Sequence, residues 1–319
     1  MIAQTFAWHG GVKLEENSAV TNVFPNVAVQ PDGGFIVADF RESQVRRYDG
    51  DGHLRGYFGR RGDGPREFPT PLTSAVSMQS GDIAVTQFDG TLTLLDSALT
   101  EILSQAQSGL SPLYSAKVLS PHQLLLAGRP RGNADYTYPP LLHIWDIQSQ
   151  RVVQSFFTAP VEPKFARASV TLGIVATAVH PDTIAATFAL TDTVFLFDYA
   201  GHVLERIRIP FRFFHHIRQP AQLRSGVKAR QQWLKAISQV TDLFWLRDGR
   251  FVVQYFRSDE GRQEFGLIGL TRSGDSLFEI TNVPRLVAID DTGESPILFF
   301  QKPGTEASRT WSIAQFATR

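Results

Sequence analysis

The 319-residue sequence contains no cysteine, and this absence excludes a whole group of functions. Disulfide bonds, thiolate catalysis, zinc–thiolate sites and covalent haem attachment all require cysteine side chains. A chain without cysteine is compatible with a reducing or an oxidising compartment, so the location of the protein stays open. Its function must therefore be sought in other side chains.

Long apolar runs are missing as well. No apolar run reaches the length of about 18 residues that a membrane-spanning helix needs. The opening residues MIAQTFAWHG also lack the basic and apolar regions of a signal peptide. We expect a soluble chain without a membrane span. The mature part of an exported bacterial protein would have the same features. Six lysines against 25 arginines favour a bacterial source.

An excess of either charge is missing too, because the 31 basic and 31 acidic residues cancel to a net charge of zero. Nucleic-acid-binding domains usually carry an overall positive charge, so nucleic acid is not favoured as the partner. The sequence has no G-x-S-x-G, H-E-x-x-H, EF-hand or P-loop pattern. It therefore predicts no metal site and no cofactor.

What the sequence does contain is a regular pattern of short strands and turns. Within residues 26–71, strands are expected at 27–29, 35–39, 44–48 and 54–58. The segments PDGG and DGDG lie between them, where proline presets one backbone angle and glycine accepts positive φ. Four short antiparallel strands in succession are typical of one propeller blade.

The same pattern recurs along the chain and predicts an all-β, six-bladed β-propeller, with four-stranded blades in a single domain over residues 1–319. Second strands are expected to start near Ile36, Ile83, Leu124, Ile184, Phe251 and Ile297. Four third strands end in an aspartate, which we interpret as a turn residue that accepts backbone N–H groups. Too few residues follow the sixth start for a complete blade. We therefore expect residues 5–14 to add the missing strand and close the ring.

One segment of this repeat resembles a known family. FGRRGDGPREFPTP, residues 58–71, is similar to the G-x-x-G-x-G-P-x-x-F-x-x-P connector of NHL-repeat six-bladed propellers, and PDGGFIVADF resembles their first hairpin. The resemblance implies the propeller fold. It implies little about activity, because NHL-like propellers include RNA-binding modules, peptide-processing lyases and exported bacterial proteins.

Two kinds of propeller enzyme resemble the predicted fold. Calcium-dependent lactonases place Glu, Asn and Asp at inner-strand starts, where this chain has Glu15, Glu16, Asn22, Asn26 and Asp242. Their Glu-Gly-Pro motif and their asparagine in the middle blades are absent here, so no cofactor is predicted, and calcium stays as the alternative. The amidating-lyase type needs three convergent histidines, which the spacing of histidines in this chain does not supply.

Two long insertions interrupt the otherwise short loops, at about residues 127–140 and 210–240. Both are expected on the rim that carries the connections between second and third strands and between blades. Long loops on a rigid scaffold often carry binding groups, and these two are basic and aromatic, so we expect an electropositive rim. The alternative is that the arginines only solvate the loops and pair with nearby acids. Apolar spacing from Ala229 to Val240 also predicts a short helix, with Trp233 as part of a lid or packed on the blade tops.

The candidate functional residues lie on this rim. The expected ligand-binding residues are Arg41, Arg61, Arg129, Arg131, Tyr136, Tyr138, Arg212 and Arg218. His215 and His216 are the candidate catalytic residues, because histidine titrates near neutral pH and serves as acid, base or ligand. We expect a monomer that binds a small anionic or aromatic molecule, or a protein or peptide. The alternative is an enzyme, a lyase, hydrolase or cyclase, with its active site at the same central pocket.

Overall fold

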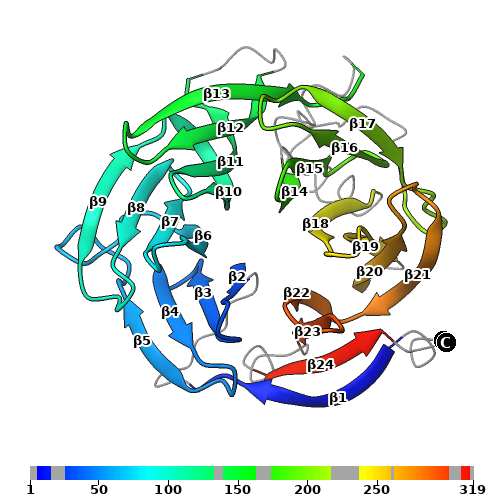
Figure 1. Cartoon of the computed structure of the whole chain (residues 1–319), viewed down its shortest axis with the longest axis horizontal. Coiled ribbons are helices and arrows are strands. Elements are labelled where there is room, and N and C mark those ends of the chain that lie inside the picture. The colour runs from blue at the N-terminus through cyan, green and yellow to red at the C-terminus, as the bar shows by residue number, and fades with distance from the viewer. Residues whose placement is uncertain are drawn as a thin grey trace. The chain divides into compact units, whose positions relative to one another are not determined.

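The computed structural model describes residues 6–15, 26–132, 139–162, 174–216, 237–259, 262–301 and 310–316. These residues form six four-stranded antiparallel sheets and contain no helix, so none of them could cross a membrane as a helix. The sheets are the blades of a six-bladed β-propeller (Figure 1), as the repeat predicted. Packing divides the chain into two compact units, Met1–Leu126 with Ile144–Val153 and Pro284–Arg319, and Ala127–His143 with Gln154–Val283.

The first two blades lie in the first unit and follow the order of the chain. Blade one consists of β2 (Asn26–Val29), β3 (Phe35–Asp39), β4 (Gln44–Tyr48) and β5 (Leu54–Phe58). Blade two consists of β6 (Leu72–Ser77), β7 (Ile83–Gln87), β8 (Thr91–Leu95) and β9 (Ile102–Gln107). Three of the four strands expected within residues 26–71 have the predicted bounds.

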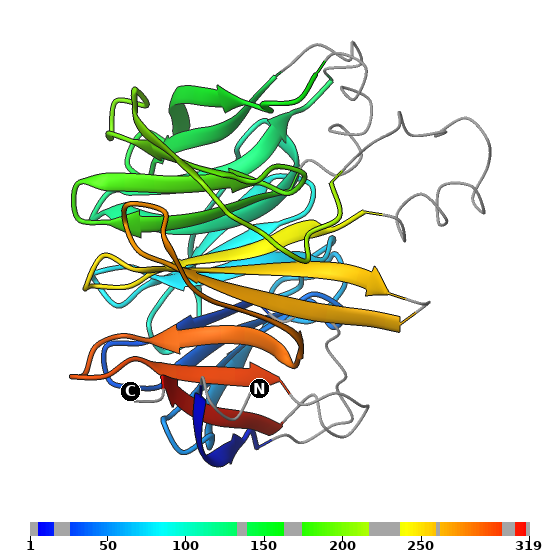
Figure 2. The same ribbon diagram turned by 90° about the vertical axis from the view of Figure 1, so that its right-hand side faces the viewer.

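The next three blades repeat this order. The third contains β10 (Leu110–Ser120), β11 (Gln123–Pro130), β12 (Pro140–Asp146) and β13 (Arg151–Thr158). The fourth contains β14 (Val175–His180), β15 (Thr183–Phe188), β16 (Thr193–Phe197) and β17 (Val203–Arg208). The fifth contains β18 (Gln239–Trp245), β19 (Phe251–Asp259), β20 (Arg262–Leu270) and β21 (Ser276–Val283). The two nine-residue strands β19 and β20 form a long hairpin, drawn in yellow and gold in Figure 2.

The last blade combines the two ends of the chain. Its strand order is β1 (Phe6–Lys13), β24 (Thr310–Phe316), β23 (Ile297–Gln301) and β22 (Arg285–Asp290), seen in Figure 1 as a blue strand beside a red one. A bulge between Trp8 and Gly11 interrupts the pairing of β1 with β24, and a Cβ at Gly11 would lie 2.5 Å from the carbonyl oxygen of Trp311. The predicted closure by the N-terminal strand is therefore confirmed.

Within a blade, the side chains of the second strand are more buried than those of the outer, fourth strand. β3, β7 and β15 are buried along their whole length, whereas side chains of β5 and β9 alternate toward solvent. A strand covered on both faces reads as a continuous apolar run, and an edge strand reads as an alternating one. This difference is why the second strands were the easiest to locate in the sequence.

The connector between blades one and two is held by a buried phenylalanine. Phe68 is fully buried and meets the ring of Phe58 edge-on, with 5.9 Å between ring centroids. Gly59 has a φ of +85°, and a Cβ there would lie 2.2 Å from the Phe68 ring. The glycine of the NHL-like motif is thus required both by its positive φ and by the close approach of the aromatic ring.

The aspartates that end the third strands serve the turns, as the sequence predicted. Asp49 accepts hydrogen bonds from the backbone N–H groups of Asp51 and His53, at 3.0 and 2.9 Å. Asp96, Asp146 and Asp198 accept equivalent backbone bonds in their own blades. Backbone hydrogen bonds lower the pKa of the Asp96 and Asp198 carboxyl groups, and the Ser149 hydroxyl and then its N–H lower the pKa of Asp146, because these bonds favour the charged form.

Candidate functional site

The candidate residues are distributed over both units, and some lie outside the described residues. Tyr136, Tyr138 and Arg218 belong to this last group, as do Trp233 and most of the expected helix around it. The first insertion joins β11 to β12, and the second joins β17 to β18. Arg41 and Arg61 lie in the first unit, whereas Arg129, Arg131, Arg212, His215 and His216 lie in the second.

In the first unit, the corner that carries Arg41 is built on a buried ion pair. The Asp39 carboxylate is 3.2 Å from a guanidinium nitrogen of Arg46, and both side chains are buried. The same carboxylate accepts the backbone N–H groups of Arg41 and Glu42, each at 2.9 Å. The side chain of Arg41 is exposed. This corner therefore has a fixed backbone and a solvent-facing cation.

The connector places several more arginines at the surface of the first unit. Arg61 is exposed, and its backbone forms a parallel bridge with Phe68. Its neighbour Arg60 pairs with Glu67 through an N–O distance of 2.6 Å. The backbone N–H of Gly64 and the Arg60 guanidinium lower the pKa of the Glu67 carboxyl, which stays ionised. Some basic residues of the predicted rim thus do pair with local acids.

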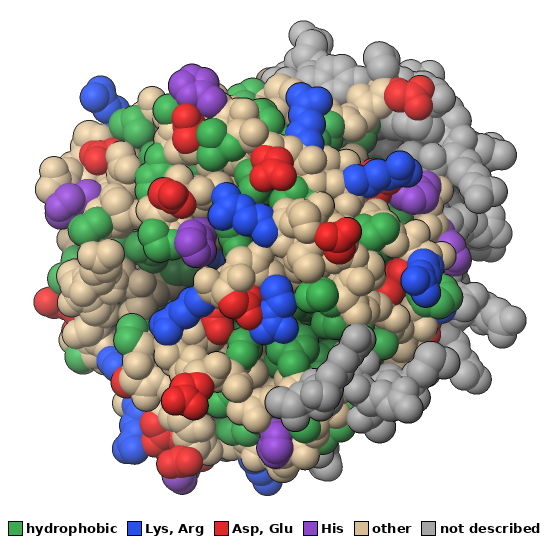
Figure 3. All heavy atoms as spheres, turned by 45° about the vertical axis from the view of Figure 1, so that its right-hand side comes forward, with side chains coloured by type: hydrophobic (Ala, Val, Ile, Leu, Met, Phe, Trp, Pro, Cys, Tyr) green, Lys and Arg blue, Asp and Glu red, His purple; other side chains and the backbone are tan. Residues whose placement is uncertain are grey.

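In the second unit, Arg129 lies near the end of β11, and Arg131 follows that strand at the start of the first insertion. Arg129 is partly buried, and its Nε is buried without a hydrogen-bond partner among the described residues. Arg131 is exposed. On the face drawn in Figure 3, basic side chains (blue) are interspersed with acidic side chains (red) rather than grouped in one positive patch.

The most completely built feature of the second unit is the segment Phe211–His216, where the second insertion leaves the blade. Its backbone is anchored by a carboxylate from β21. Glu279 accepts the N–H of Arg212 at 2.7 Å and the N–H of Phe213 at 3.2 Å. A second anchor is Ser238, whose hydroxyl accepts the N–H of His215 at 2.8 Å and whose own N–H donates to the His215 carbonyl at 2.8 Å.

A buried tyrosine positions that carboxylate. The hydroxyl of Tyr255 on β19 donates to Glu279 at 3.0 Å, and Tyr255 is fully buried. Burial and the nearby Glu279 charge both raise the pKa of the tyrosine, so its hydroxyl remains protonated and able to donate. The facing residue on β20 is Gly266, where a Cβ would lie 2.3 Å from the tyrosine ring. Glycine at this position makes room for the tyrosine.

Aromatic packing fixes which side chains of the segment face solvent. Phe211 and Phe214 are stacked with centroids 4.5 Å apart, and both rings meet Tyr255 edge-on. Phe214 is buried, whereas Arg212, Phe213, His215 and His216 are exposed. The anchored backbone therefore presents one cation, one aromatic ring and two imidazoles to solvent.

Arg257 packs near the exposed ring of Phe213. It is buried, forms an ion pair with Glu264, and directs a guanidinium nitrogen toward the carbonyl oxygen of Phe213 at 3.5 Å. Its guanidinium carbon lies 5.7 Å from the centroid of the Phe213 ring. The two histidines differ in their surroundings, because His216 meets the Phe214 ring edge-on at 5.1 Å. Within the described ranges, neither imidazole is hydrogen-bonded to a carboxylate.

Sequence reasoning missed two of these structural residues, Glu279 and Tyr255, and it expected Arg257 on the rim rather than buried. Glu279 is the one charged residue of the strand β21, SLFEITNV, and that is the signal that could have marked it. The partners of these residues lie far away along the chain, so the sequence alone does not connect them.

His143 on β12 was also missed. Its Nδ1 lies 2.8 Å from the Ser155 hydroxyl and its Nε2 lies 3.3 Å from the carbonyl oxygen of Gly128. The side chain is buried, and desolvation lowers the pKa of His143 from 6.5 to about 4. It is a neutral interior histidine rather than part of an exposed site.

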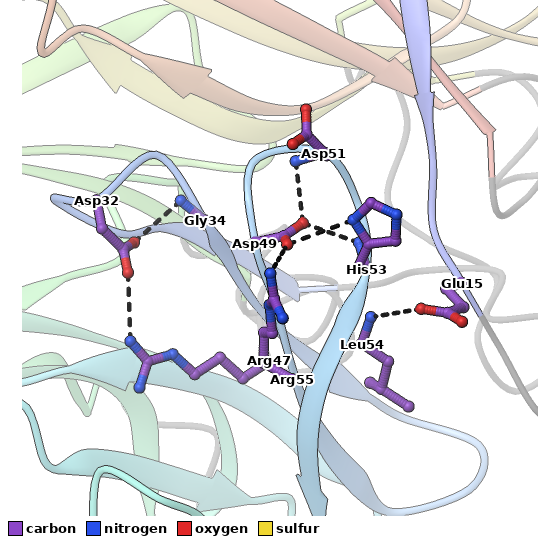
Figure 4. A network of polar contacts seen from close by, with 9 residues as sticks. All are labelled: Glu15, Asp32, Gly34, Arg47, Asp49, Asp51, His53, Leu54 and Arg55. Atoms are coloured by element: carbon purple, nitrogen blue, oxygen red, sulfur yellow. Dashed lines mark hydrogen bonds and ion pairs between the residues drawn. The ribbon is translucent and has the colours of Figure 1, made fainter.

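A group of acidic and imidazole side chains lies at the turn between β4 and β5. Ligand atoms of Asp49, Asp51 and His53 lie within 4.8 Å of one another. The Asp49 carboxylate accepts hydrogen bonds from the Arg55 guanidinium, at 2.5 Å, and from the backbone N–H of Asp51 (Figure 4). Glu15, one of the lactonase-like candidates, accepts the backbone N–H of Leu54 at 3.2 Å. These contacts account for the group as part of the turn.

Comparison with known proteins supports the fold and leaves the family open. No protein-family model matches the chain, and no curated protein matches it in sequence. Its fold is similar to the solved structure of a DUF4221 family member from Bacteroides vulgatus, with 10% identity, a TM-score of 0.67 and 98% of each chain covered. It is also similar to a candidate exported protein from Bacteroides fragilis, with 12% identity, a TM-score of 0.64, and coverage of 98% of this chain and 94% of that one. At these identities the likeness establishes the six-bladed propeller fold, and membership of the NHL family is not confirmed.

Proposed function

We propose that this protein is a monomeric binding module for a small anionic or aromatic ligand, and that the Phe211–His216 segment forms the centre of its site. One observation carries the proposal: a backbone anchored by Glu279 and Ser238 holds Arg212, Phe213 and the two histidines exposed. A backbone that is already fixed loses little conformational entropy on binding, which favours affinity.

The chemistry of the exposed side chains fits such a ligand. A guanidinium such as that of Arg212 binds carboxylate or phosphate through two parallel hydrogen bonds. The Phe213 ring, 43% exposed, offers a face for stacking, and Arg257 lies behind it. The other candidate ligand-binding residues stay predictions from the sequence: Arg129, Arg131, Tyr136, Tyr138 and Arg218 belong to the second unit, and Arg41 and Arg61 belong to the first.

A thermal-shift screen with nucleotides, sugar acids and acidic peptides tests this proposal. A ligand at a hundred times its Kd adds about 2.7 kcal/mol to the free energy of unfolding, which corresponds to a rise in Tm of roughly five degrees for a domain of this size. The rise should be lost in Arg212→Ala. It should persist in Arg208→Ala, which removes an exposed arginine that pairs with Asp192 on the same unit. A rise that is the same in both variants would contradict the proposed site.

The same ligand distinguishes binding from catalysis. If the protein is an enzyme that uses His215 or His216 as a base, the double alanine variant should keep its affinity for the ligand and lose turnover. If it only binds, no turnover is seen in the wild-type protein, and the variant changes the affinity alone.

We further propose that the chain is the mature part of an exported bacterial protein. The support is its fold likeness to the candidate exported protein of Bacteroides fragilis. Fractionation of the native cells tests this: the protein should appear outside the cytoplasm, and its retention in the cytoplasmic fraction would contradict the proposal.

A further inference from the structure

An open cleft of about 740 Å³ lies in the first unit beside the connector. It is bounded by the outer strand β5, the turn between β8 and β9, and the connector itself. Its lining includes Gly56, Tyr57, Arg60, Arg66, Glu67 and Leu99. The volume is in the range of about 300–1,000 Å³ that is usual for small-molecule sites. None of these residues belongs to the Phe211–His216 segment.

Arg66 has an unusual backbone and a fixed side chain. Its φ is +93°, a value that glycine adopts without strain and that a residue with a Cβ rarely adopts. Its guanidinium lies over the Phe58 ring, 4.7 Å from the centroid, and one nitrogen approaches the Leu99 carbonyl oxygen at 3.5 Å. In the described part of the chain, this is the one acceptor that its five N–H donors meet. The chain thus places an arginine where a glycine would fit better, and holds its planar group in one orientation.

The carboxylate in the lining is already engaged by the connector. Glu67 pairs with Arg60, and its other oxygen accepts the N–H of Gly64 at 2.8 Å. A Cβ at Gly62 would lie 2.0 Å from that carboxylate, so the loop encloses it closely. Two guanidinium groups against one carboxylate leave the lining with a net positive charge.

A second cleft, of about 470 Å³, is also lined by residues of the connector, and its lining has the opposite charge. Asp63, Glu67 and Asp89 contribute three carboxylates to it and no cation. An anion is therefore repelled from this cleft and attracted to the cleft that contains Arg66.

Tyr57 gives the basic cleft an aromatic wall. Side chains of β5 alternate, so Tyr57 points to solvent, with 55% of its surface exposed, while Phe58 is buried. Gly56 and Gly59, which flank these two residues, contribute only backbone to the cleft. Tyr57 and Arg66 line the same cleft, so an exposed aromatic ring is available to stack on a planar group whose charged end meets the guanidinium.

We propose that this cleft binds a small organic anion in which a carboxylate is attached to a planar ring. The carboxylate accepts hydrogen bonds from the Arg66 guanidinium, and the ring packs against Tyr57. The site is separate from the one proposed at Arg212 and does not depend on it.

Calorimetric titration of the full chain with benzoate tests the inference, with benzamide as the neutral probe of the same shape. Benzoate should bind and benzamide should bind at least about tenfold more weakly, because the charge-assisted hydrogen bonds are lost. Arg66→Gly should weaken benzoate binding by a similar factor without disturbing the fold, since glycine suits the backbone at this position. Tyr57→Ala should also weaken it. Arg55→Ala, an exposed arginine on the same strand that pairs with Asp49, is the matched control and should bind as the wild type does.

Two results would overturn the inference. One is the absence of saturable benzoate binding up to about 10 mM, well above a weak millimolar affinity. The other is wild-type affinity in both Arg66→Gly and Tyr57→Ala. Benzoate binding that keeps wild-type affinity in Arg66→Gly and Tyr57→Ala but is lost in Arg212→Ala would belong to the Phe211–His216 segment instead, so failure of one proposed site is distinguishable from failure of the other.

Discussion

The buried His143 predicts that the protein loses stability in mild acid. The Gly128 carbonyl oxygen can only accept, so the neutral imidazole carries its proton on Nε2 and accepts the Ser155 hydroxyl hydrogen at Nδ1. Burial opposes the charged form and lowers the pKa of His143 from 6.5 to about 4 in the folded protein. In the unfolded chain the imidazole is solvated and takes up a proton near its ordinary pKa.

The unfolded state therefore binds more protons than the folded state between these two pKa values. Stability from this residue is complete above the unfolded pKa of 6.5 and is lost as the pH falls toward the folded pKa of about 4. The loss should reach about 2 kcal/mol at about pH 5 and about 3 kcal/mol below both pKa values.

Urea unfolding of the wild type and of His143→Gln at a series of pH values measures the contribution of His143 to the free energy of unfolding. The variant keeps a polar side chain that can donate and accept but that does not titrate. It also keeps every other histidine, so the background pH dependence is shared. The difference in free energy of unfolding should shift by about 2 kcal/mol in favour of the variant between about pH 7.5 and about pH 5. Parallel pH profiles for the two proteins would refute the reasoning, because they would mean that the imidazole is not held neutral.

Two further changes test the packing of blades one and two. Gly59→Ala introduces a Cβ at 2.2 Å from the Phe68 ring, so it should lower the free energy of unfolding by about 2–4 kcal/mol through backbone strain and overpacking together. Gly109→Ala, at a similar φ of +76° with nothing within 4 Å of the added Cβ, should cost only about 1–2 kcal/mol for the strain, and equal losses in the two variants would exclude the steric explanation. Asp39→Asn removes the carboxylate charge that lies 3.2 Å from the buried guanidinium of Arg46, and breaking this buried ion pair should cost about 3–5 kcal/mol in a urea titration. A loss below about 1 kcal/mol would mean that water reaches the pair.

The fold could be predicted because its determinants are local. Turn segments such as PDGG and DGDG set the ends of strands by their backbone preferences, whatever surrounds them. The second strands started at or within one residue of the expected positions, since strands covered on both faces must be apolar throughout. The closure by β1 followed from the number of strands that remained.

The candidate site was only partly predictable. The sequence by itself marked Arg212, His215 and His216 as members of a basic, aromatic insertion, because composition and loop length are local properties. It did not indicate that Glu279, 67 residues beyond Arg212, holds the backbone of that segment, or that Tyr255 positions the carboxylate.

These contacts, like the burial of His143, join residues from different strands and depend on how the chain folds in three dimensions. A side chain's type is written in the sequence, but its partners and its exposure to water are determined by tertiary packing. For this protein, the sequence alone therefore determined the blades and their order. Only the tertiary structure decided which polar groups are buried supports and which are presented to a ligand.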